Sequence, residues 1–152
     1  MFKKIKRIVN ELRVNQRKTL AAQEKNRYAQ EQVYASNKLS AILPKSHFIP
    51  ETGWSMTPKA LLHCLNIIQI QKASTIIEFG SGASTIYIAQ ILKNQGVDAT
   101  FYSVESDLDW KAAIEKQLEV LGLDTYVSLV HCPIVRVSKE LLYKEQQTWY
   151  DT

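Results

Sequence analysis

Residues 74–132 alternate short runs of β-branched and aromatic residues with longer segments of helical periodicity. Three predicted strands and two intervening helices follow one another over 74–79, 84–95, 99–105, 107–122 and 126–132. Short connections between alternating strands and helices require a parallel sheet with right-handed crossovers. The sequence therefore predicts an α/β fold, the first half of a doubly wound, Rossmann-like parallel sheet of three strands, in which the first strand is buried.

The charge divides the chain into two regions. Residues 1–47 hold eleven Lys or Arg against three Glu, whereas residues 48–152 hold eight Lys or Arg against twelve acidic residues. The chain of 152 residues suits one domain. We therefore expect a basic helical leader over 1–43 and a partial Rossmann-like domain over 44–152.

The leader lacks Gly and Pro and is rich in good helix formers, which predicts one or two long helices. Its first turns carry an apolar stripe, flanked by Lys and Arg, that consists of Phe2, Ile5, Val9 and Leu12. Such a helix could bind an anionic membrane surface or dock on a protein partner. An exposed helix with a solvated charged face is the interpretation that the sequence favours.

Several classes of protein do not fit this composition. No apolar run is long enough to span a bilayer, and the N-terminus lacks the apolar core of a signal peptide, so we expect a cytoplasmic protein. Cys64 and Cys132 lack CxxC spacing and the three histidines are far apart, so no metal site is expected. The leader has no nucleic-acid reading motif, so no nucleic acid is expected as a partner.

A glycine turn follows the first predicted strand in "IIEFGSGAST" (76–85). Such a turn usually binds phosphate through its N–H groups, yet Glu78 stands two residues before it and would repel a phosphate. The second strand ends at Glu105, where a carboxylate can accept both hydroxyls of a ribose. Thr85 replaces the third Gly of the dinucleotide fingerprint, which also disfavours NAD. A nucleoside that carries positive charge fits better.

The two segments "IIEFGSGAST" and "FYSVESDLDW" resemble the first two motifs of class I S-adenosylmethionine-dependent methyltransferases. The resemblance covers about residues 54–134, and Ser84 stands where the usual motif has its last Gly. It implies S-adenosyl-L-methionine as cofactor, with Glu78 at the methionine end, Glu105 on the ribose, and Asp107 beside the adenine. The cofactor-binding residues that it implies are Glu78, Gly80, Ser81, Gly82, Ser84, Glu105, Ser106, His131 and Cys132.

The resemblance leaves the chemistry of the acceptor open. No catalytic base or acceptor pocket is evident in the sequence, and Trp54 and Ser55 either close the cofactor pocket or pack on the surface. With only three strands predicted, we expect an incomplete or degenerate methyltransferase. Its isolated chain should self-associate through the open edge of the first strand, bind S-adenosylmethionine weakly if at all, and be inactive. A non-catalytic Rossmann-like interaction module and, less favoured, an NAD-binding oxidoreductase fragment are the alternatives.

Overall fold

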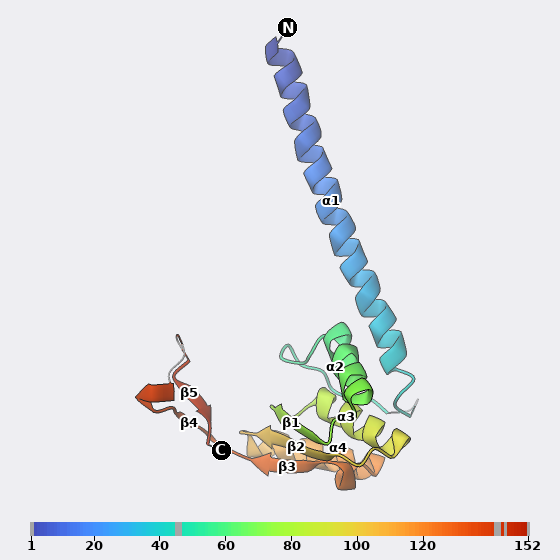
Figure 1. Ribbon diagram of the computed structural model, residues 1–152, viewed down its shortest axis with the longest axis vertical. Helices are drawn as coiled ribbons and strands as arrows, with labels where there is room; N and C mark the ends of the chain where they lie inside the picture. Colours follow the sequence, from blue (N-terminus) through green and yellow to red (C-terminus); the bar gives the residue numbers. More distant parts are fainter. Residues whose placement is uncertain (1, 45–46, 142–143, 145, 152) are drawn as a thin grey trace.

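The computed structural model describes residues 2–44, 47–141, 144 and 146–151. Helix α1 (Phe2–Leu39) projects from the body as a single rod, and only its last turns pack on helix α2 (Pro58–Gln71) (Figure 1). Ala35 and Leu39 are the buried side chains of α1. Of the one or two helices expected, the structure has a single one, because neither Gly nor Pro interrupts it.

Helix α2 has a distinct cap at each end. Thr57 is the N-cap and accepts the N–H of Ala60, while Pro58 takes the first helical position. Leu61, Leu65 and Ile68 are buried on its inner face. The helix ends at Lys72, whose φ of 49° is left-handed. This helix therefore places one apolar face against the α/β body.

The body consists of β1 (Thr75–Phe79), α3 (Ala83–Gln95), β2 (Thr100–Glu105), α4 (Leu108–Leu121), the 3-10 turn η1 (Asp124–Tyr126) and β3 (Ser128–His131). The strands form a parallel sheet of order β1-β2-β3. Gly96 and Gly122 are left-handed C-caps of α3 and α4. The α/β fold and the three parallel strands are thus confirmed.

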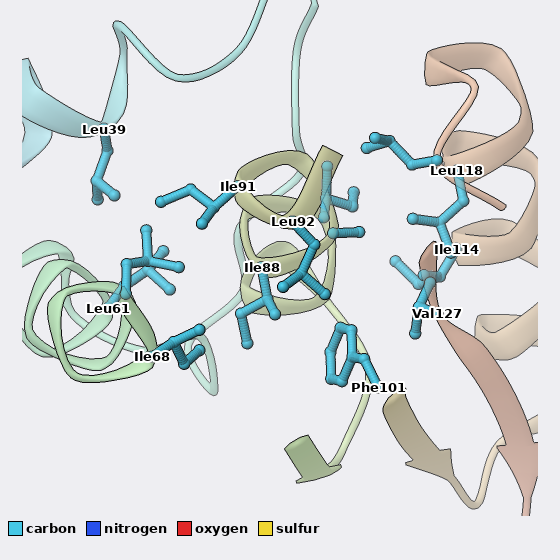
Figure 2. Packing of buried hydrophobic residues seen from close by; sticks show 14 residues of the cluster. Leu39, Leu61, Ile68, Ile88, Ile91, Leu92, Phe101, Ile114, Leu118 and Val127 are labelled. Atoms are coloured by element: carbon cyan, nitrogen blue, oxygen red, sulfur yellow. The ribbon is translucent and has the colours of Figure 1, made fainter. Parts of the chain in front are cut away.

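The core lies between the helices and one face of the sheet. Figure 2 shows Ile88 and Leu92 of α3 between α2 and α4, with Phe101 of β2 beneath them. Ile114 and Leu118 close this core from α4. Because apolar side chains from four helices, including Leu39 of α1, and from the sheet meet here, burial of their surface is the main force that holds the body together.

The opposite face of the sheet is open, and this corrects the prediction of a buried first strand. Ile77, Phe79, Tyr102 and Val130 point to this face and are between 37% and 60% exposed. Side chains of β1 alternate in burial because helices cover one face only. In the described residues β1 pairs with β2 alone, so it is an edge strand, as expected.

A second correction concerns the number of strands. After the parallel sheet, β4 (Ile134–Arg136) and β5 (Thr148–Tyr150) form an antiparallel pair that the sequence analysis did not predict. The 3-10 turn η2 (Lys139–Leu141) lies between them. The pair extends from one end of the sheet (Figure 1). Within the described part of the chain, no helix is long and apolar enough to cross a membrane.

Candidate cofactor pocket

The carboxyl ends of β1 and β2 bring two glutamates next to the glycine turn. Glu78 is the penultimate residue of β1, and Glu105 is the last residue of β2. Between β1 and α3, Gly80 has a φ of +90° and donates its N–H to the carbonyl of Val104 at 2.8 Å. That left-handed φ favours glycine, because a Cβ would strain the backbone there.

Glu105 is a carboxylate surrounded by donors. Its Oε2 accepts the N–H and the hydroxyl of Ser81 at 2.9 and 3.0 Å, and its Oε1 accepts the N–H groups of Ser106 and Asp107 at 2.7 and 2.9 Å. The Ser106 hydroxyl lies 3.4 Å from the same Oε1. The lone pairs of both oxygens are therefore used.

These hydrogen bonds determine the protonation state of Glu105. Burial raises the pKa of this carboxyl, but the N–H of Asp107, the N–H and hydroxyl of Ser81 and the N–H of Ser106 together outweigh burial. The pKa of Glu105 consequently lies below the ordinary value. Its side chain, only 6% exposed, is thus an ionised acceptor at neutral pH.

Glu78 has the opposite environment. Its Oε2 accepts the hydroxyls of Thr85 and Ser103 at 2.6 and 2.8 Å, and both of these residues are fully buried. Thr85 in turn accepts the N–H of Gly82 at 2.8 Å, which links the carboxylate to the turn. Burial raises the pKa of Glu78 above its ordinary value, and hydroxyl donors offset only part of this effect.

A cavity of about 820 Å³ opens at this end of the sheet. Its volume is in the range of small-molecule sites. Seven of the nine residues predicted to bind cofactor line it, namely Glu78, Gly80, Ser81, Gly82, Ser84, Glu105 and Ser106. Further lining residues anticipated from the sequence are Trp54, Ser55 and Asp107. The pocket therefore collects residues from four separate segments of the chain.

The other two predicted residues do not line the cavity. His131 is exposed at the end of β3, and its Nε2 lies 3.1 Å from the carbonyl oxygen of Ser106. Cys132 is buried, and its N–H donates to the carbonyl of Glu105 at 2.9 Å. Both residues therefore contact the end of β2 or the residue after it without lining the cavity.

Two aromatic residues that were not predicted to bind cofactor also line the pocket. Trp110 packs against the core, donates its Nε1–H to the Ser81 carbonyl at 2.8 Å and also lines the cavity. Tyr150 of β5 lines the cavity as well. The aromatic, β-branched run "TWY" was the signal that could have indicated this strand.

The β4-β5 pair is held against β1 by an aromatic cluster. Phe79 lies 5.5 Å from Trp149 and 5.4 Å from Tyr150 between ring centroids. The hydroxyl of Tyr150 lies 3.7 Å from the position that a Cβ on Gly80 would take. Burial and the charge of Glu105 raise the pKa of Tyr150. This tyrosine is consequently a neutral wall of the pocket.

Comparisons with known proteins give little further information. No family model and no curated protein matches the chain. A solved structure titled "Crystal structure of a putative O-methyltransferase from Klebsiella pneumoniae" is similar with a TM-score of 0.46 and 19% identity, over 71% of this chain. The chain spans 42% of the length of that structure. The fold class rests on the strand topology of the chain itself.

In the described residues no group of three or more His, Cys, Asp or Glu side chains could hold a metal ion.

Proposed function

We propose that residues 44–152 form the S-adenosylmethionine-binding part of a class I methyltransferase that transfers a methyl group to an unidentified acceptor. One observation carries the proposal: Glu78 and Glu105, at the ends of adjacent parallel strands, flank a bare-backbone turn at one cavity. Ligands of open α/β sheets bind at this end of the strands. The proposal includes a cytoplasmic location.

The environment of Glu105 fits a ribose. Two of its donors are the hydroxyls of Ser81 and Ser106, whose side chains can rotate, while the remaining donors are backbone N–H groups. The two hydroxyls of a ribose could replace these serine hydroxyls and leave the backbone donors in place. We infer that Ser81 and Ser106 keep the carboxylate satisfied until a nucleoside binds.

The environment of Glu78 fits a cation. This carboxyl lies at the pocket wall with its pKa raised by burial, and an approaching positive charge would favour its ionised form. A pyrophosphate in the same place would meet a carboxylate and would be repelled. S-adenosylmethionine has an ammonium and a sulfonium, so its charge suits Glu78.

The bound cofactor would supply an electrophilic methyl group on its sulfonium. The residues of this chain would bind and orient the two ends of the nucleoside, Glu105 at the ribose and Glu78 at the cationic end. Trp110 and Tyr150 offer aromatic walls to the cavity, and Trp54 lines it as well but is 98% exposed. Such a reaction depends mainly on proximity and orientation, so no general base is assigned.

A non-catalytic interaction module is the second candidate, and the open face of the sheet favours it. Ile77 and Phe79 on β1 remain 60% and 48% exposed, which is typical of a surface that another layer covers. In that case the pocket would bind no nucleoside. The NAD-binding alternative is less favoured because Thr85, in place of the third glycine, is fully buried and bonded to Glu78.

Calorimetric titration separates the three candidates. We expect the full chain to bind S-adenosylhomocysteine, to bind NAD at least about tenfold more weakly, and to lose affinity on Glu105→Ala by about 1.5–3 kcal/mol. Glu119→Ala, at an exposed position of α4, is the matched control and should bind like the wild type. Binding of neither ligand would favour the interaction module, and preference for NAD would contradict the methyltransferase proposal.

A further inference from the structure

We propose that the first turns of α1, residues 2–13, bind the surface of an anionic lipid bilayer. This segment is part of the rod that leaves the body in Figure 1, and the side chains described from Lys4 to Gln30 are all exposed. The proposal therefore concerns a surface that nothing else in the described structure covers. It is independent of the cofactor pocket.

The apolar stripe lies along one side of this helical segment. It consists of Phe2, Ile5, Val9 and Leu12, which are spaced by three or four residues, together with Ile8, and all five side chains are exposed. At about 100° per residue these five positions fall within about 120° of the helix circumference. A stripe of this width can enter the boundary between headgroups and acyl chains while the helix lies flat.

Basic residues flank the stripe on both sides. Lys4 and Lys6, the neighbours of Ile5, point about 100° to either side of it. Between residues 2 and 20 the sequence has seven Lys or Arg and the single acid Glu11. Lysines beside an apolar stripe can bury their methylene stems and extend their ammonium groups to the phosphates. The charge is therefore complementary to an anionic bilayer.

The pattern fits a bilayer better than a second copy of the helix. A coiled coil needs apolar residues to continue at the same three-and-four spacing over several heptads. Beyond Leu12 this spacing falls on Gln16, Thr19, Gln23 and Asn26, which are polar. The apolar stripe thus ends after about three turns, a length that suits shallow insertion rather than a long helical interface.

Vesicle co-sedimentation tests the proposal with the full chain. We expect it to pellet with vesicles of equal parts phosphatidylcholine and phosphatidylglycerol, and to stay in solution with phosphatidylcholine alone. Each basic residue near an anionic surface strengthens binding about fivefold, so Lys4→Glu with Lys6→Glu should weaken it at least about 25-fold. Raising the ionic strength to about 1 M should release the chain, because charges are then screened within about 3 Å.

Two further variants separate the stripe from the total charge. Ile5→Ser with Leu12→Ser keeps the charge and should also weaken binding, since the apolar anchor is lost. Lys116→Glu with Lys139→Glu changes the total charge equally at exposed positions of the body and should leave binding nearly unchanged. Far-UV circular dichroism checks that each variant keeps its helix content.

Three results would overturn the proposal. One is equal pelleting with neutral and anionic vesicles, and another is an equal loss in the Lys116 and Lys139 variant. The third is absence of vesicle binding, whether α1 then stays free or associates with a second copy or with a protein. Light scattering of the full chain and of the Ile5 and Leu12 variant would identify self-association in that case.

Discussion

One carboxylate oxygen of Glu105 accepts both the backbone N–H and the hydroxyl of Ser81, although the two residues are 24 positions apart. The end of β2 is thereby tied to the turn that follows β1. Because the other oxygen accepts the N–H groups of Ser106 and Asp107, one side chain orders the loops after two strands. The turn is therefore shaped before any ligand binds.

Glu105→Gln should destabilise the fold. Both carboxylate oxygens of Glu105 accept hydrogen bonds, and the NH₂ group of a glutamine would replace one of these oxygens and face its donors. We expect the free energy of unfolding in urea to fall by about 1–3 kcal/mol, the cost of leaving buried donors unpaired. Glu119→Gln on exposed α4 is the matched control and should have almost no effect. Equal stability of the two variants would show that the Glu105 bonds are not formed.

Gly80→Ala tests the left-handed turn. At a φ of +90° a side chain strains the backbone, and the added Cβ itself has only an ordinary contact with Tyr150. We expect a loss of about 1–2 kcal/mol in the free energy of unfolding from strain alone. Gly53→Ala is the control, because its Cβ would meet open space and its φ is not left-handed. Similar stabilities would argue against this turn.

Acidification should weaken binding through Glu78. Because burial raises the pKa of Glu78 above the ordinary value of about 4.3, this carboxyl gains its proton at a higher pH than Glu105 does. The protonated form cannot attract a cation, so affinity for S-adenosylmethionine should rise from about pH 4 to pH 7. Glu78→Gln should flatten that part of the calorimetric pH profile. A profile that is unchanged by the substitution would contradict the role of Glu78.

Glu78→Gln should also raise the free energy of unfolding at neutral pH. A group with a raised pKa in the folded state favours folding below its unfolded pKa of about 4.3, and this contribution is lost as pH rises through the folded pKa. Glutamine imitates the protonated carboxyl and can still accept the hydroxyls of Thr85 and Ser103. The free energy of unfolding in urea should therefore be higher for Glu78→Gln than for the wild type at pH 7, and the two should be equal near pH 4.

Tyr150→Ala should release the β4-β5 pair from β1. The variant loses the ring contacts with Phe79 and Trp149, and each aromatic pair contributes about 0.5–1.5 kcal/mol. The emission of the tryptophans should shift to longer wavelength as Trp149 becomes solvated. Tyr150→Phe keeps the ring and is the matched control. If both variants shift the emission equally, the hydroxyl rather than the ring holds the pair in place.

The open edge of β1 predicts self-association that depends on concentration. Ile77 lies in the middle of this edge strand and is 60% exposed on the open face. A lysine on an edge strand hinders pairing with another chain, so Ile77→Lys should lower the mass measured by light scattering. Val120→Lys, at a 70% exposed apolar position on α4, is the control. A wild-type chain that stays monomeric at all concentrations would refute this prediction.

The parts that could be predicted from the sequence are those set by local periodicity and caps. Thr57 with Pro58 is a sequence signal for the start of α2, and Gly96 and Gly122 are signals for the ends of α3 and α4, because each cap depends on one residue and its neighbours. The parallel direction of the three strands followed from the short crossovers. The pocket followed from the rule that such sheets bind ligands at their carboxyl ends.

The parts that could not be predicted depend on contacts distant in sequence. β4 and β5 have three residues each, which is too short for a periodicity signal, and they are ordered by pairing with each other and by contact with Phe79. Burial of β1 was overestimated because its apolar residues do not indicate whether a second layer covers them. The bonds between Glu105 and Ser81 likewise become visible only in three dimensions.

Helix α1 has one end that packs on the body and is stable, and a long exposed part that is only marginally stable. The stretch around Ala35 and Leu39 shares the free energy of the core, so its amide protons exchange only when the body opens. From Lys4 to Gln30 the helix has exposed side chains, and its order comes from local interactions such as helical hydrogen bonds and the Arg7–Glu11 ion pair, which are marginal for isolated helices in water. Hydrogen exchange along α1 should therefore slow gradually toward Leu39. A surface that binds the first turns would extend slow exchange back toward Phe2.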